Sequence, residues 1–276
     1  MAEHYSQVHC VRQTEFYGRT YRVTEHFATI PEVSSDTLEL LNTEQMIEVD
    51  RLMTDVLKIE LIQMMENAGR NLARLCISRF LHDPQSKRVM VMAGTGGNGG
   101  GALVAARRLH QWGANVSVFT TKPDEAYSGV PAHQLGILQR LGVEINHSVL
   151  PEANAAPEVI LDGLIGYSLK GNPRGRAAEL MAWANASSSP VLALDTPSGL
   201  DSTTGESHVS TIVADATMTL ALPKAGLLTE GTQPFVGELY LSDIGVPDWV
   251  YQKIGREADL GRMFMHSDIV KITDHF

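Results

Sequence analysis

The sequence has little cysteine and no long apolar segment. Its 276 residues include two cysteines, Cys10 and Cys76, which are too few for a disulfide framework. No stretch reaches the roughly 18 consecutive apolar residues that a membrane-spanning helix needs. The first 37 residues also lack the apolar block of a signal peptide and contain acidic residues, which transit peptides avoid. We therefore expect a cytoplasmic protein with no membrane partner.

Positive charge is also scarce. Lysine and arginine number 22 against 32 aspartates and glutamates, so the formal net charge is −10. A broad nucleic-acid surface needs a basic footprint, and we expect no nucleic-acid partner. A small ligand that carries phosphate stays possible, because a few backbone N–H groups and single lysines can hold it.

Short apolar runs alternate with helical patterns along most of the chain. Two helical patterns between residues 43 and 80 come first. Strands are then expected at the following positions, with helices between most of them: 89–93, 115–120, 158–161, 191–194, 216–222 and 237–241. Such alternation predicts an α/β fold, with a mostly parallel central sheet covered by helices on both faces.

The two ends of the chain lack this pattern. We expect residues 1–38 to form an N-terminal arm that is partly disordered. Residues 39–255 contain no repeat or Pro/Ser linker and are predicted to form one domain. Residues 256–276 are polar and are predicted to be a C-terminal tail.

A glycine-rich stretch follows the first apolar strand. Six glycines lie between Gly94 and Gly101, and a helical pattern follows, so free N–H groups at a helix N-terminus are expected to suit a phosphate. The G-x-G-x-x-G spacing is weak evidence by itself, because a tight turn also explains it. The NAD fingerprint further asks for an acidic residue at the end of the second strand, where this chain has Thr120, Thr121 and Lys122. An ordinary NAD dehydrogenase is therefore disfavoured.

Polar side chains follow three strands of the expected sheet. Asn98 follows the strand expected at 89–93, Asp162 the strand at 158–161 and Asp195 the strand at 191–194, and ligands bind at such carboxyl ends. Each aspartate could instead cap a helix or lie in a turn. Asn98, Asp162 and Ser198 offer hard oxygen ligands that suit an alkali or alkaline-earth cation and not zinc. Ser198 is not in a G-x-S-x-G sequence, which disfavours a hydrolase.

Several motifs occur together in one order: MMENAGR, GTGGNGGGALVAAR, DGLIGYSLKG, DTPSGLDSTTG, ADATMTLALPKAGL and DIGVP. As a set, which runs from about Leu41 to Pro247, they resemble the NAD(P)HX epimerases, the YjeF N-terminal domain family. The resemblance implies a Rossmann-like three-layer α/β/α sandwich, often a homodimer. It implies interconversion of the R and S forms of NADHX or NADPHX at C6 of the nicotinamide ring, which repairs damaged cofactor. A separate S-specific NAD(P)HX dehydratase is the implied pathway partner.

The resemblance also assigns roles to residues. It implies one K+ per subunit held by Asn98, Asp162 and Ser198. The implied substrate contacts are Asp195 and two glycine-bearing loops: Gly97, Asn98, Gly99, Gly100 and Gly101 in the first, and Gly166, Tyr167, Ser168, Leu169, Lys170, Gly171 and Asn172 in the second.

Two departures from the family's usual GNNGGDG loop matter for the site: Gly97 replaces an Asn and Gly101 replaces an Asp. Epimerisation requires a hydroxyl to leave and water to return, and we expect Asp162 to act as acid or base, with Lys170 as its partner or as an anchor for substrate. Loop N–H groups are expected to hold phosphate, and Asp195 to hold hydroxyls. The alternative is a catalytically weak or inactive nucleotide-binding or interaction protein on the same fold.

Overall fold

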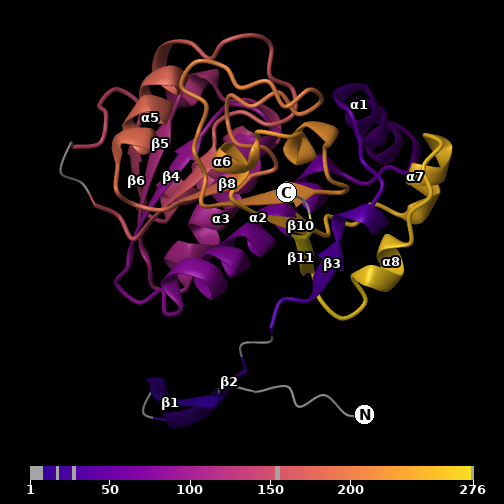
Figure 1. Ribbon diagram of the computed structural model, residues 1–276. Helices are drawn as coiled ribbons and strands as arrows, with labels where there is room; N and C mark the ends of the chain where they lie inside the picture. The colour runs from indigo at the N-terminus through magenta and orange to yellow at the C-terminus, as the bar shows by residue number, and fades with distance from the viewer. Residues whose placement is uncertain (1–8, 17–18, 27–28, 153–155, 275–276) are drawn as a thin grey trace.

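The protein is built on one large sheet of nine strands (Figure 1). The computed structural model describes residues 9–16, 19–26, 29–152 and 156–274. The strand order is β3-β11-β10-β9-β8-β7-β4-β5-β6, and only the β10–β11 pair is antiparallel. The strands are β3 Glu32–Ser34, β4 Arg88–Ala93, β5 Asn115–Thr120, β6 Glu144–Asn146, β7 Val159–Gly163, β8 Val191–Leu194, β9 Ala216–Leu220, β10 Glu238–Ser242 and β11 Ile269–Thr273.

Helices cover both faces of this sheet. Alternate residues of β4 point to opposite faces: Val89 and Val91 pack into a core with α2, α3 and α4, whereas Met90 and Met92 pack with α5. A third apolar cluster lies under α1 and α7. The predicted α/β/α sandwich with a mostly parallel sheet is therefore confirmed. The helices are α1 Thr43–Arg51, α2 Leu61–Cys76, α3 Gly97–Gln111, α4 Gly129–Arg140, α5 Gly175–Ala186, α6 Gln233–Val236, α7 Asp248–Lys253 and α8 Leu260–Met263.

Two helices carry π-helical extensions. Leu52–Val56 continues α1 and Ile77–Leu81 continues α2. The α1 helix begins at a capping box, in which Asn42 accepts from the Gln45 N–H and the Gln45 side chain accepts from the Asn42 N–H. Among the described residues, no helix is both long and apolar enough to cross a bilayer.

The C-terminal end of the chain differs from the expected polar tail. Residues 269–273 form β11, which pairs with β10 and β3, and Val270 and Ile272 are buried in the core. The alternation of apolar residues in this segment is too short to predict a strand from the sequence. In the structure, β10 and β3 provide the backbone partners that make it a strand. Earlier in the chain, β1 His9–Phe16 and β2 Arg19–His26 pair as an antiparallel hairpin. Within the expected N-terminal arm, residues 1–8, 17–18 and 27–28 lie outside the described residues.

Candidate active site

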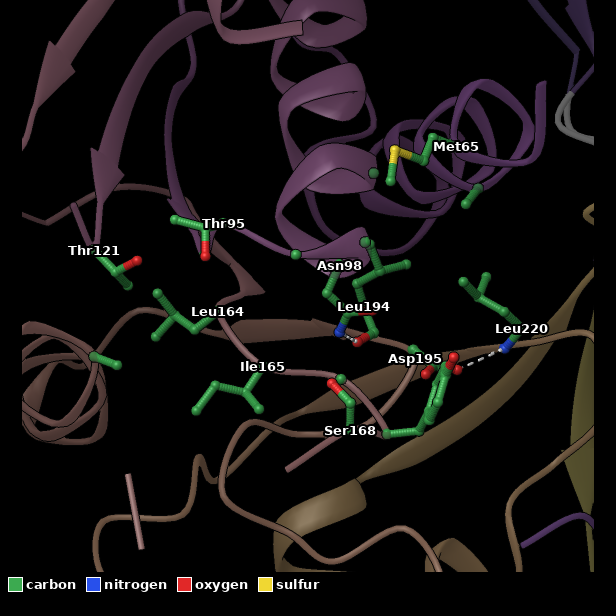
Figure 2. A pocket seen from close by; sticks show the side chains of 18 of the residues that line it. Met65, Thr95, Asn98, Thr121, Leu164, Ile165, Ser168, Leu194, Asp195 and Leu220 are labelled. Carbon is green, nitrogen blue, oxygen red and sulfur yellow. Dashed lines mark hydrogen bonds between the residues drawn. The ribbon is translucent and has the colours of Figure 1, made fainter. Parts of the chain in front are cut away.

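A cavity of about 730 Å³ opens at the carboxyl ends of the central strands. It lies between α1, α2, the N-terminus of α3, the segment after β7 and the N-terminus of α5 (Figure 2). The cavity brings together three of the predicted features, because its wall includes Gly97, Asn98, Gly101, Gly166, Tyr167, Ser168 and Asp195. This convergence is what a parallel sheet produces at its carboxyl edge.

The glycine-rich stretch is mostly helix and not loop. Helix α3 starts at Gly97 with Gly96 as its cap, and the Gly100 N–H already donates to the Gly96 carbonyl. Free N–H groups are therefore those of the first turn, Gly97 to Gly99, and not the whole stretch to Gly101. A Cβ at Gly99 would lie 1.8 Å from the Gly94 oxygen, so close backbone packing explains the glycine there. This helix end faces the cavity and suits an anion.

Asp195 lies at the cavity with its backbone in the left-handed region, at φ 67°. One carboxylate oxygen, Oδ1, accepts from the Lys224 ammonium and, at 3.3 Å, from the Leu220 N–H (Figure 2). Lys224 is fully buried and also donates to the Leu220 carbonyl at 2.7 Å. Lys224 was not among the residues predicted for the site. Its position inside the apolar run ALPKAGL was the available signal, because a lysine is rarely buried without a partner.

A second carboxylate, which was not predicted from the sequence, lies on the same wall. Asp50, near the end of α1, lines the cavity and accepts a hydrogen bond from the Tyr167 hydroxyl. Burial is the main cause that raises the pKa of Asp50; the Tyr167 hydrogen bond lowers it, the Asp195 charge raises it, and the Lys224 charge lowers it. Asp50 sits in a helical pattern with no motif around it, so the sequence contained no specific signal for it.

Asp162 lies behind the cavity wall and is fully buried. Its carboxylate accepts from the Ser198 N–H at 2.8 Å, the Ser198 hydroxyl at 2.7 Å and the Leu164 N–H at 3.1 Å. Burial raises the pKa of Asp162 to about 6, against these hydrogen bonds, which lower it. The two bonds from Ser198 tie the end of β7 to the segment after β8, whereas the bond from Leu164 is local. Asp162 therefore shapes the wall that carries Tyr167.

Lys170 and its neighbours lie away from the cavity. Lys170 is exposed, and Leu169, Lys170, Gly171 and Asn172 are not among the lining residues. Asn172 instead accepts from the Val209 N–H at 3.2 Å. The expected pairing of Asp162 with Lys170 is therefore not seen, because one side chain is sealed behind the wall and the other points to solvent. Gly100 also lies outside the lining, beside Met65, where a Cβ would be 2.4 Å from the Met65 sulfur.

The far end of the cavity is basic. Lys122 follows β5, and Arg174 and Arg176 flank the start of α5; all three line the cavity. Arg176 donates to the Val149 carbonyl, but its Nε has no partner among the described residues. The cavity thus has an acidic end, formed by Asp50 and Asp195, and a cationic end.

These features define a class: an α/β protein of Rossmann-like architecture, whose strand-end cavity beside a glycine-rich helix suits a nucleotide. The family model described as YjeF-related protein N-terminus matches residues 61–226. The chain belongs to this YjeF N-terminal family.

Named relatives agree with this assignment. The chain is 44% identical over 226 residues to an "NAD(P)H-hydrate epimerase" of Dehalogenimonas lykanthroporepellens, covering 82% of this chain and 89% of that one. It is 35% identical to a "Bifunctional NAD(P)H-hydrate repair enzyme Nnr" of Pyrobaculum aerophilum, covering 80% of this chain and 47% of the relative. The crystal structure of yeast ynu0 has the same fold, with a TM-score of 0.68 at 23% identity over 85% of this chain and 100% of that one.

Proposed function

We propose that this protein is an NAD(P)H-hydrate epimerase, which interconverts the R and S forms of NADHX or NADPHX at C6 of the nicotinamide ring. The observation that supports this most directly is the cavity, whose wall includes residues from each of the segments that carry the family motifs. Relatives named as epimerases match over most of the chain, at 44% and 36% identity in two bacteria, Dehalogenimonas lykanthroporepellens and Rhodopirellula baltica.

The cavity has the polarity that such a substrate needs. A hydrated dinucleotide carries a pyrophosphate in its middle and the reacting ring at one end. The first turn of α3 lies in the wall and offers N–H groups to phosphate. We place the reacting ring at the end that holds Asp50 and Asp195, because loss of hydroxide leaves a cationic iminium ring, which negative charge stabilises. The other end, with Lys122 and Arg174, then receives the adenosine part.

A potassium ion is part of the proposal, and the residues fit it. Every hydrogen-bond partner of the buried Asp162 carboxylate is neutral, so its charge lacks a counter-ion among the described residues. Asn98 uses its Nδ2 to donate to the Leu194 carbonyl at 2.7 Å, which leaves Oδ1 without a partner in the described structure (Figure 2). Asn98, Asp162 and Ser198 would hold the ion, and its charge would hold the two strand-end segments together. No group of three His, Cys, Asp or Glu that could hold a metal occurs among the described residues, which agrees with a weakly charged oxygen site.

The cellular setting is also proposed. The bifunctional relative carries the name of a repair enzyme and is about twice as long as the region that it shares with this chain. We propose an S-specific NAD(P)HX dehydratase as the pathway partner of this protein. We further propose a cytoplasmic homodimer, and sedimentation equilibrium tests the oligomeric state.

A coupled assay tests the proposed function. R-form NADPHX is mixed with an S-specific dehydratase and its nucleotide, and return of NADPH is followed with and without this protein. We expect a rate above the uncatalysed epimerisation that increases with protein concentration. No acceleration in the presence of potassium, with binding of NADPHX still detected by calorimetry, would instead support a nucleotide-binding protein without this activity.

A further inference from the structure

The acidic end of the cavity contains two carboxylates that differ in their partners. Asp195 is bonded to the buried ammonium of Lys224, which stabilises its negative charge. Asp50 has no cationic partner among the described residues; its one hydrogen-bond donor there is the neutral Tyr167 hydroxyl. Both side chains line the same cavity, and each carboxylate keeps one oxygen without a partner in the described structure: Asp50 Oδ1 and Asp195 Oδ2.

This difference in partners distinguishes Asp50 and Asp195 as candidate acid and base. Double ionisation is disfavoured when two carboxylates share a partly buried site. The Lys224 ammonium is bonded to Asp195 and not to Asp50, and this geometry favours Asp50 as the acid of the pair. The direction of the Asp50 pKa agrees, since burial and the Asp195 charge both raise it. The charged and titratable groups that face Asp50 from other elements are Tyr167, Asp195 and Lys224, while Arg51 on α1 is bonded to Glu48 at the exposed side.

We propose that Asp50 and Asp195 are the acid and base of the epimerisation, with Asp50 protonated and Asp195 ionised in the resting enzyme. This inference rests on the proposed function. In the R-to-S direction, the ring nitrogen lone pair forms the C6=N bond while the C6–O bond breaks, and the departing hydroxyl takes the Asp50 proton and leaves as water. A water then adds to C6 from the opposite face, its proton passes to Asp195, and the C6=N electrons return to nitrogen.

The two carboxylates have then exchanged roles, and proton exchange with solvent restores the resting state. The S-to-R direction uses Asp195 as acid and Asp50 as base, as microscopic reversibility requires. Tyr167 positions the Asp50 carboxyl, because its hydroxyl holds one oxygen and leaves the other toward the cavity. Tyr167 belongs to the predicted second substrate loop, so the position of this loop affects the orientation of the Asp50 carboxyl.

The test compares Asp50→Asn with wild type in the coupled assay. We expect kcat to fall about 10²-fold or more, the usual contribution of a positioned acid or base, while KM and the calorimetric affinity for NADPHX change only a few-fold. Asp50→Glu should recover part of the lost rate, because it restores an ionisable group on a longer stem. Asp55→Asn is the matched control, since Asp55 lies on the same helical segment, is exposed and is outside the cavity lining.

A pH profile separates an acid from a structural residue. In wild type, kcat/KM should fall as pH rises through the pKa of Asp50, because the acid is then lost. Tyr167→Phe removes a hydrogen bond that lowers this pKa, so this basic limb should move to higher pH. An inactive wild-type protein would refute the proposed function. An active wild type, with Asp50→Asn within about threefold of it in kcat or with an unmoved basic limb in Tyr167→Phe, would refute this inference alone.

Discussion

The Lys224 ammonium and the Asp195 carboxylate form an ion pair in which the two side chains are 0% and 3% exposed, respectively. Such a pair contributes little net stability but is costly to break, because removal of one partner leaves a buried charge. Here the pair connects the segment after β8 to the segment after β9 and fixes a carboxylate at the cavity wall. It therefore belongs both to the fold and to the site.

The first prediction concerns this pair. Lys224→Met should lower the free energy of unfolding by about 3–5 kcal/mol at pH 7, because Asp195 is left buried without a counter-ion. The double variant Asp195→Asn/Lys224→Met should be more stable than Lys224→Met alone, since no charge then remains. Asn suits position 195, because it tolerates the left-handed backbone found there. Urea denaturation of wild type, the single variants Asp195→Asn and Lys224→Met, and the double variant gives the coupling energy. A Lys224→Met midpoint equal to that of wild type would contradict the prediction.

The cationic end of the cavity predicts a preference for the phosphorylated substrate. Dinucleotide sites that bind an unphosphorylated ribose use an acidic residue after the second strand, whereas this chain has Lys122 there and Arg174 across the cavity. Lys122→Ala and Arg174→Ala should each raise KM for NADPHX about tenfold or more, as loss of a charged hydrogen bond implies, and change KM for NADHX less. Lys87→Ala, before β4 and thus at the opposite end of the strands, is the control. Equal effects on both substrates would show that these cations do not recognise the 2′-phosphate.

Potassium should stabilise the fold as well as the site. An ion that binds only the folded state adds RT ln(1 + [K+]/Kd), or about 2.7 kcal/mol at one hundred times Kd. We therefore expect a higher Tm in potassium chloride than in tetramethylammonium chloride at equal ionic strength. Asp162→Asn should abolish this difference, because the buried negative charge is gone. Calorimetric scans in both salts measure it, and a salt-independent wild-type Tm would argue against a potassium site.

The sequence predicted the fold well, because short apolar runs such as β4 and β8 alternate with longer helical patterns, and this alternation indicates a parallel sheet covered by helices. It also placed Asn98 and Asp195 at one edge, since parallel strands share a direction. The sequence did not show that α3 begins at Gly97, because glycines disfavour helix unless tertiary packing compensates for their low helix propensity. Here close contacts do so, with a Cβ at Gly94 placed 2.0 Å from the Leu164 oxygen.

The part of the site that comes from outside the motifs could not be predicted. Asp50 enters the cavity because α1 packs against the end of the sheet, a tertiary contact that no local pattern encodes. The role of Asp162 is similarly ambiguous in the sequence. A strand-end carboxylate can line a cavity or bond to a neighbouring segment, and Asp162 does the second, through its hydrogen bonds with Ser198.

The close approach of α2 and α3 predicts opposite effects for two glycine substitutions. A Cβ at Gly69 would lie 2.4 Å from the Gly101 backbone oxygen, so Gly69→Ala should force the helices apart and cost about 1–3 kcal/mol, despite a gain of about 1 kcal/mol in helix propensity. Gly136 lies within α4, where a Cβ meets only the flexible end of Arg140 at 3.2 Å, so Gly136→Ala should be neutral or stabilising by up to about 1 kcal/mol. Urea midpoints measure both. Because Gly101 also lines the cavity, Gly69→Ala should raise KM for NADPHX as well, and a stable Gly69→Ala protein with unchanged KM would show that the two helices can separate without disturbing the site.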